Sequence, residues 1–128
     1  MTPFAARKLR RQMFPLALSR VKLGLAGHYR AFGHSMEPVI PSGSRITIEP
    51  LDVEKIEVGD IVLVKVGDAT MLHLVKTIDA QQRRFEISGT SAPSGWTSFD
   101  CVYAICTRID GREVPGAARK ARRHQAQR

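Results

Sequence analysis

The sequence predicts a mostly β domain with a short N-terminal helix, and three features support this fold class. Apolar and polar residues alternate over residues 45–49, which is the period of a strand with one buried face. The β-branched run over residues 61–66 is followed by Gly67 and Asp68, a pair suited to a tight hairpin with glycine at its first central position. Residues 70–78 are then predicted as the returning strand of that hairpin.

The N-terminal segment has a different pattern. Over residues 4–25, apolar residues recur at roughly helical spacing among basic ones, which predicts a basic amphipathic helix. Such a helix most often covers one face of its own domain, and a membrane surface is the alternative. The apolar positions are Phe4, Leu9, Met13, Leu16 and Leu23.

The remaining strands are predicted from shorter signals. Residues 29–32, 83–88 and 101–109 are predicted as strands, which makes about six in total. Residues 89–98 are rich in Gly, Ser, Thr and Pro and are predicted as a loop. The tail beyond Gly111 has little apolar content, which predicts disorder. The predicted parts are a basic N-terminal segment (1–27), a β domain (28–110) and a basic disordered tail (111–128).

Length and charge set the class of protein. At 128 residues the chain can form one domain with a real core, and it has no run of about 18 uncharged apolar residues that would span a membrane. The net charge of +8 is concentrated at the ends: residues 1–30 carry seven Lys/Arg and no acid, whereas residues 31–111 carry seven Lys/Arg and eleven acids. Basic ends suggest nucleic acid, an anionic membrane surface or an acidic partner, and solubilising ends explain them equally well.

The cysteines indicate the compartment. Cys101 and Cys106 are five residues apart on a predicted strand, so their side chains fall on opposite faces and an internal disulfide is not expected. Free thiols are typical of a reduced compartment, which predicts a cytoplasmic protein, peripheral to the membrane if its basic ends bind lipid. The cysteine spacing fits no zinc pattern and the histidines are scattered, so neither a metal nor another cofactor is expected.

The stretch from Gly33 to Gly43 ends a predicted strand with an abrupt, stiff turn. Gly33 can adopt backbone angles that other residues avoid, and Pro38 and Pro41 fix their own φ. Ser35 lies within this stiff turn, so that its hydroxyl can be aimed at a substrate, as a nucleophile requires. A polar turn residue without a catalytic role is the alternative explanation for a lone serine after a glycine.

The pattern Gly-x-Ser-Met-x-Pro-x-Ile followed by Gly resembles the nucleophile box of the signal peptidase I family and of the related LexA-type self-cleaving repressors. The match covers seven or eight positions, and a second box, Gly-Asp-Ile-Val, follows at residues 59–62. The resemblance implies that Ser35 is the nucleophile, and it implies a twisted, barrel-like β fold. Most bacterial signal peptidases are membrane-anchored. This sequence departs from that pattern, because it has no run that would span a membrane, so a soluble member without a transmembrane anchor is expected.

The same resemblance implies a general base on the strand after the Gly-Asp box. His73 lies there, 38 residues past Ser35, and Lys76 competes with it from the opposite face of the predicted strand. Most bacterial members and the LexA-type repressors have lysine as the base, whereas the endoplasmic-reticulum and spore-former branch has histidine. The spacing favours His73, which titrates near neutrality, whereas a lysine needs a large pKa shift through burial. A half-buried strand histidine bonded to a carbonyl is the structural alternative.

In the histidine branch, an aspartate after the next hairpin orients the base. Thr90 occupies that place, and Asp100 is the nearest acid, so each is a candidate for orienting His73; without them, Ser35 and His73 form a dyad. The backbone N–H of Ser35, together with that of His34, is the candidate donor to the oxyanion.

The sequence therefore predicts a serine endopeptidase that processes a dedicated protein or peptide through a Ser35/His73 dyad. The resemblance implies a substrate bound as an extended strand beside residues 29–32. Self-cleavage between Ala26 and Gly27 is one alternative, although only eight residues separate Gly27 from Ser35. The other alternative is a non-catalytic β domain that binds nucleic acid or an acidic partner through its basic ends.

Overall fold

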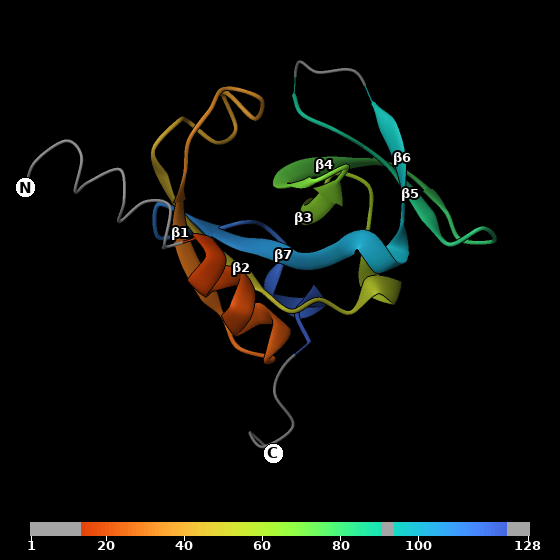
Figure 1. Cartoon of the computed structure of the whole chain (residues 1–128), viewed down its shortest axis with the longest axis horizontal. Coiled ribbons are helices and arrows are strands. Elements are labelled where there is room, and N and C mark those ends of the chain that lie inside the picture. Colours follow the sequence, from red (N-terminus) through yellow and green to blue (C-terminus); the bar gives the residue numbers. More distant parts are fainter. Residues whose placement is uncertain (1–13, 91–93, 123–128) are drawn as a thin grey trace, which may run out of the picture.

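In the computed structural model, which describes residues 14–90 and 94–122, one antiparallel sheet curls into a half-barrel with a helix over residues 14–22 against it (Figure 1). The mostly β fold class is confirmed. The strands lie in the order β1-β2-β7-β3-β4-β5-β6, with β8 paired to β7. The strands are β1 (Gly27–Ala31), β2 (Ser44–Glu49), β3 (Ile61–Val66), β4 (Ala69–Asp79), β5 (Arg84–Ser88), β6 (Gly95–Ser98), β7 (Val102–Ile109) and β8 (Arg112–Glu113). Three 3-10 helices connect them: η1 (Val53–Lys55), η2 (Phe99–Cys101) and η3 (Ala118–Lys120).

Strand β7 joins the two halves of the sheet. One edge of β7 pairs with β2, and its other edge pairs with β3. The connection between β1 and β2 carries Ser35, whereas His73 lies on β4 in the other half. The two predicted catalytic residues therefore come from different halves of the sheet.

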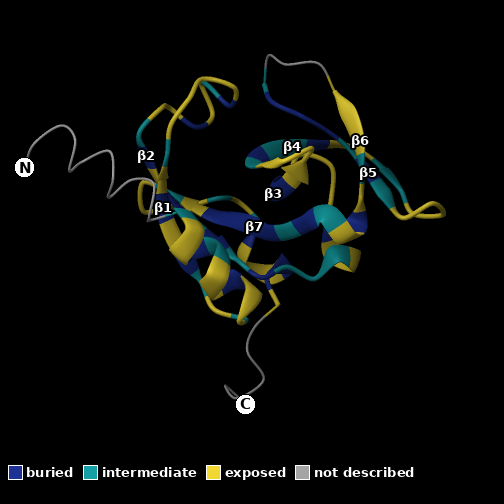
Figure 2. Ribbon diagram, in the orientation of Figure 1, coloured by how far each residue is buried: buried dark blue, intermediate teal, exposed yellow. Residues whose placement is uncertain are grey.

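The sheet buries apolar residues on both of its faces (Figure 2). In β3, Ile61 and Leu63 pack into one apolar cluster, whereas Val62 and Val64 pack into a second, and none of the four is more than 3 % exposed. Burial on both faces explains why this strand is a continuous apolar run in the sequence and not an alternating one.

The helix over residues 14–22 covers the first cluster, as predicted for the end of the segment 4–25; residues 4–13 lie outside the described residues. Its buried residues include Ala17, which is 1 % exposed. Gly27 on β1 allows this close packing, because a Cβ at that position would lie 2.6 Å from the backbone oxygen of Ala17. The glycine at the start of β1 thus sets how closely the helix approaches the sheet.

The C-terminal segment differs from the prediction, because residues 111–122 pack against the domain instead of being disordered. Ala117 is fully buried in the second cluster, and Lys120 is 6 % exposed. The Lys120 ammonium donates to both carboxylate oxygens of Asp60, at 2.7 and 2.9 Å, and lies 3.0 Å from the Glu57 carboxylate. The prediction counted apolar residues and missed that small alanines and one buried ion pair can dock a polar segment. The rest of the predicted tail lies outside the described residues.

Two smaller predictions have opposite outcomes. Strand β6 lies within the stretch predicted as a loop and pairs with β5. Cys101 and Cys106 are both free, as predicted, and burial raises the pKa of the Cys106 thiol to about 12.

None of the described helices is long and apolar enough to cross a membrane.

Candidate active site

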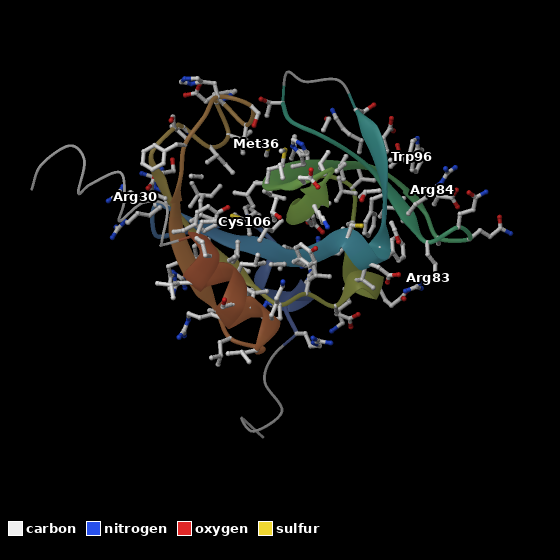
Figure 3. All side chains as sticks on the ribbon, in the orientation of Figure 1. Arg30, Met36, Arg83, Arg84, Trp96 and Cys106 are labelled. Carbon is white, nitrogen blue, oxygen red and sulfur yellow. The ribbon has the colours of Figure 1, made fainter. Side chains whose placement is uncertain are left out.

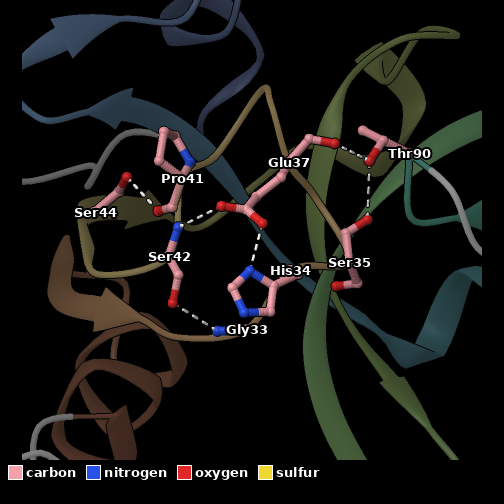
Figure 4. Close-up of polar contacts among 8 residues, drawn as sticks. All are labelled: Gly33, His34, Ser35, Glu37, Pro41, Ser42, Ser44 and Thr90. Carbon is pink, nitrogen blue, oxygen red and sulfur yellow. Dashed lines mark hydrogen bonds and ion pairs between the residues drawn. The ribbon is translucent and has the colours of Figure 1, made fainter.

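The nucleophile loop, residues 33–43, is held by hydrogen bonds within itself (Figure 4) and by one to the end of β1. The N–H of Gly43 donates to the carbonyl of Ala31 over 2.7 Å, which closes the loop at its base. The N–H of Gly33 donates to the Ser42 hydroxyl over 3.0 Å. Gly33 has a φ of +117°, which favours glycine, so the stiff turn predicted from the sequence is present.

Two apolar residues anchor the nucleophile loop in the core. Met36 and Ile40 are 5 % and 3 % exposed and belong to the first cluster, and Figure 3 shows Met36 between the loop and the strands. Ser35 directly precedes Met36 but is exposed. Its hydroxyl has no hydrogen-bond partner among the described residues. The loop therefore presents an accessible serine hydroxyl on an anchored backbone, as the predicted nucleophile requires.

Gly89 and Thr90, which follow β5, contact the backbone of Ser35, and Figure 4 shows the contact of Thr90. The N–H of Thr90 donates to the carbonyl oxygen of Ser35 over 2.7 Å. The Thr90 hydroxyl donates to the same oxygen over 3.1 Å and to the carbonyl oxygen of Glu37. A Cβ added to Gly89 would lie 2.4 Å from the Ser35 oxygen and 3.2 Å from the Ser35 Cβ. The end of β5 and the nucleophile loop are thus in direct backbone contact.

The side chain of His34 points toward the carboxylate of Glu37 (Figure 4). Its Nδ1 hydrogen-bonds to the Glu37 carboxylate, and the N–H of Ser42 donates to that carboxylate over 3.4 Å. These contacts, the one with His34 most, lower the pKa of the Glu37 carboxyl group. The ring of His34 therefore helps to hold the nucleophile loop in place through Glu37. The backbone N–H of His34 takes no part in these contacts.

The N–H groups of His34 and Ser35 were predicted to stabilise an oxyanion. Within the described ranges, neither N–H donates to a protein acceptor. The carbonyl of His34 accepts from the N–H of Glu37 over 3.2 Å, which fixes the peptide plane that contains the Ser35 N–H. A fixed, unpaired N–H beside an exposed hydroxyl is the arrangement that a tetrahedral oxyanion needs.

His73 lies on β4 where the ladder between β4 and β5 ends. Its neighbour Leu74 pairs with Ser88, so the next position along the antiparallel ladder sets His73 opposite Gly89. The Nδ1 of His73 is buried and has no hydrogen-bond partner in the described structure. Burial lowers the pKa of His73, and the backbone of Leu72 opposes this shift.

Ser35 and His73 line separate grooves that adjoin along β4. His73 and Met71 are two residues apart on one strand, so their side chains lie on the same face of β4. Gly89 contacts Ser35 and lies opposite His73, although no hydrogen bond joins the Ser35 hydroxyl to the His73 ring among the described residues. The nucleophile groove, as we call the one beside the serine, is lined by Tyr29, Ala31 and Ser35 on one side and by Thr70, Met71 and Leu72 on the other.

Lys76, the competing candidate for the base, lies at a β-bulge. The register between β4 and β5 shifts between Val75 and Thr77, and the side chain of Lys76 is exposed there. Its charge acts on the carboxylate of Glu86, whose pKa is lowered mainly by hydrogen bonds from Ser94 and Thr77. Lys76 lines neither the nucleophile groove nor the groove of His73.

The two candidates for orienting His73 have other surroundings. The Thr90 hydroxyl is directed at two carbonyl groups of the nucleophile loop. Asp100 is exposed on η2 and lines a groove with Lys22, whereas His73 lines a different one. In the part of the chain that the structure describes, neither side chain hydrogen-bonds to His73. An orienting role therefore stays a prediction for both.

Sequence reasoning did not identify the role of Gly89. A signal was present, because a glycine at the end of a strand often marks the close approach of another backbone. Its partner Ser35 is 54 residues away, however, and no spacing rule connects the two positions. The contact became visible only when the sheet brought β5 beside the nucleophile loop.

A comparison with protein families gives a match that covers most of this site. The model of a family described as Peptidase S24-like matches residues 6–88, which is more than half of the 128 residues. The matched region contains Ser35, the Gly-Asp box and His73, and it ends at Ser88, directly before Gly89. No curated protein matches the chain.

Proposed function

The chain belongs to the Peptidase S24-like family, and from this premise we propose that it is a serine endopeptidase that cuts a dedicated protein or peptide. The proposal rests on the exposure of the Ser35 hydroxyl and on the hydrogen bonds that hold its backbone. Its hydroxyl is exposed and unpartnered in the described structure, while Thr90 and the rest of the nucleophile loop hold its backbone. Nucleophilic catalysis needs this combination of a fixed backbone and an accessible hydroxyl.

In the proposed reaction, the Ser35 hydroxyl oxygen attacks the carbonyl carbon of the scissile peptide bond while His73 accepts the proton. The backbone N–H of Ser35, with that of His34 as a second donor, stabilises the negative charge on the tetrahedral intermediate. His73 then gives its proton to the leaving amine, which leaves an acyl-enzyme. Water activated by the same residue hydrolyses the acyl-enzyme and restores Ser35.

Two observations support His73 as the base. The β4–β5 ladder sets it opposite Gly89, and Gly89 contacts the backbone of Ser35. Burial lowers the pKa of His73, which keeps the ring neutral and able to accept a proton at neutral pH. Lys76, by contrast, is exposed at the bulge and lines neither the nucleophile groove nor the groove of His73.

The substrate is proposed to bind as an extended strand along the nucleophile groove. In the described sheet, β1 pairs only with β2, and residues 69–73 of β4 pair only with β3. Both strands line the groove, and both have an unpaired edge along these residues. An added peptide strand can hydrogen-bond to such edges, which fixes the scissile bond beside Ser35.

Digestion of a peptide library, with the products identified by mass spectrometry, tests the proposal. We expect the wild-type chain to cleave a subset of the peptides and Ser35→Ala to cleave none. Ser19→Ala is the matched control, because Ser19 is an exposed serine on the helix, outside the nucleophile loop. A wild-type chain that is folded by circular dichroism but cleaves nothing would overturn the proposal and favour a non-catalytic β domain.

Self-cleavage between Ala26 and Gly27 has less support. Gly27 is buried in β1, where it pairs with Ile48 and packs on the helix backbone at Ala17. A bond beside a paired, buried residue is a poor substrate, because it has to leave the sheet before it can enter the nucleophile groove. Intact-mass measurement after long incubation checks this point, and we expect an uncut chain.

The proposed partners of the basic ends rest on sequence alone. Part of each end, residues 1–13 and 123–128, lies outside the described residues. Binding to nucleic acid, to an anionic membrane or to an acidic partner therefore stays a prediction, and so does the cytoplasmic location.

A further inference from the structure

We infer that Thr90 is a positioning residue for Ser35: together with Gly89, it fixes the nucleophile loop relative to the strand that carries His73. The inference rests on the proposed function, because it assigns these residues a role in the same reaction. It also gives a role to the position where an orienting acid was expected from the sequence.

Thr90 holds the nucleophile loop at two points. Its N–H and its hydroxyl both donate to the carbonyl oxygen of Ser35, at 2.7 and 3.1 Å, and its hydroxyl also donates to the carbonyl of Glu37. These two carbonyl groups lie on either side of Met36, whose side chain is anchored in the core. The backbone that follows the nucleophile is therefore fixed by hydrogen bonds on one side and by apolar packing on the other.

Gly89 sets the distance between the loop and β5. A Cβ at this position would lie 2.4 Å from the Ser35 oxygen and 3.2 Å from the Ser35 carbonyl carbon. Both atoms belong to the backbone, so they cannot turn aside as the end of a flexible side chain can. Any residue larger than glycine at position 89 therefore moves the nucleophile loop away from the sheet.

The ladder between β4 and β5 relates this contact to His73. Because Leu74 pairs with Ser88, the next position sets His73 opposite Gly89. Side chains at opposed positions of an antiparallel pair share a face, with Cβ atoms about 4.5–5.5 Å apart. Gly89 has no side chain, and Ser35 fills the space where one would be. The backbone carbonyl group and the Cβ of Ser35 thus lie where the side chain of the cross-strand neighbour of His73 would be.

The hydroxyl of Thr90 suits this task better than a carboxylate does. An ionised carboxylate only accepts hydrogen bonds, so an aspartate at position 90 would face two carbonyl oxygens without a proton to donate. A hydroxyl supplies the proton. The geometry of the nucleophile loop therefore explains why a threonine stands at this position.

The test compares the rate at which a fluorophosphonate probe modifies Ser35, measured by intact mass, in four chains: wild type, Thr90→Val, Thr90→Ser and Thr77→Val. Thr77→Val is the matched control, because the Thr77 hydroxyl donates to Glu86 over 2.8 Å, outside the site. Since a misplacement of about 1 Å can slow a reaction about 10²-fold, we expect Thr90→Val to react at least about tenfold more slowly. Thr90→Ser keeps the donor and should restore the rate, and Thr77→Val should react like wild type. The pH midpoint of the reaction should be the same in all four, because positioning does not change the base.

A second measurement, amide hydrogen exchange over residues 33–43, separates the inference from the proposed function. We expect faster exchange in Thr90→Val than in wild type and Thr77→Val. If Thr90→Val reacts and exchanges like Thr77→Val, the inference is overturned while the proposed function stands. If the probe modifies neither wild type nor Ser35→Ala, the proposed function fails. Amide exchange then still decides whether Thr90 holds the loop.

Discussion

Lys120 and Asp60 form a buried ion pair that ties the C-terminal segment to the turn before β3. Their side chains are 7 % and 8 % exposed, and Lys120 donates to both carboxylate oxygens. The backbone carbonyl of Asp60 in turn accepts from the N–H of Val75 on β4 over 2.9 Å. Through these bonds a segment beyond the family match supports the strand that carries His73.

Removal of the Lys120 ammonium should destabilise the domain strongly. Lys120→Ala leaves the Asp60 carboxylate buried without its counter-ion, which costs about 3–5 kcal/mol in the free energy of unfolding. Arg119→Ala is the control, because Arg119 is exposed and lies 3.7 Å from Glu57; it should cost about 0–1 kcal/mol. Urea unfolding of the three chains measures both values. Equal stabilities of the two variants would contradict a structural role of the ion pair.

Substitution of the proposed base should separate His73 from Lys76. His73→Ala should lower the rate of peptide cleavage by about 10²–10⁴, because the Ser35 hydroxyl loses its proton acceptor. Lys76→Ala should have little effect, since Lys76 is exposed at the bulge. Steady-state cleavage of one library peptide measures both. A complete loss of activity in Lys76→Ala, with His73→Ala active, would reverse the assignment.

The pH dependence of cleavage should report the neutral form of His73. Burial lowers its pKa below the ordinary value of 6.5, so activity should fall with a midpoint below pH 6.5 as the ring becomes protonated. Because the folded-state pKa is the lower one, the associated stability is present above the unfolded-state pKa and is lost as the pH falls through the folded-state pKa. The pH profile of kcat/KM measures the midpoint. His28→Gln, which changes an exposed histidine, should leave it in place, and a midpoint far above 6.5 would point to another base.

Gly27→Ala should loosen the packing of the helix on β1. The added methyl would lie 2.6 Å from the Ala17 oxygen and 2.8 Å from its Cα, so the helix has to shift, at a cost of about 1–3 kcal/mol. Gly95→Ala is the matched control, since a Cβ there meets nothing within 4 Å. The urea midpoints of the two variants compare these effects. A Gly27→Ala chain as stable as the Gly95→Ala chain would show that the helix adapts without cost.

The fold was predictable where the signal was local. The apolar run in β3, the Gly67-Asp68 turn and the return strand β4 lie within about twenty residues of sequence, so periodicity and turn chemistry suffice to place them. Strand β6 was missed because glycine, serine and proline dominate the composition around it. The docking of Lys120 was missed because its partner Asp60 lies sixty residues earlier, and composition alone does not reveal a buried pair.

The same limit applies to the site. The turn around Ser35 was predictable, because glycine and proline restrict the backbone locally. The contact of Ser35 with Thr90 was not, since it joins residues 55 positions apart, and Thr90 was considered only as an orienting group for His73. The sequence pattern suggested candidate chemical groups, whereas the contacts that hold their backbone depend on the pairing of distant strands.

The central position of β7 has a consequence for the newly synthesised chain. The β1–β2 hairpin and the β3–β6 meander are joined in the described sheet only through β7, which begins at Val102. A ribosome adds about 5–20 residues per second. The β1–β2 hairpin, which carries Ser35, and strand β4, which carries His73, are therefore synthesised several seconds before β7 is complete. During this interval the nascent polypeptide has unpaired strand edges at β2 and β3, and the candidate site is not yet assembled. The late synthesis of β7 thus delays assembly of the candidate site until Ile109 has been added.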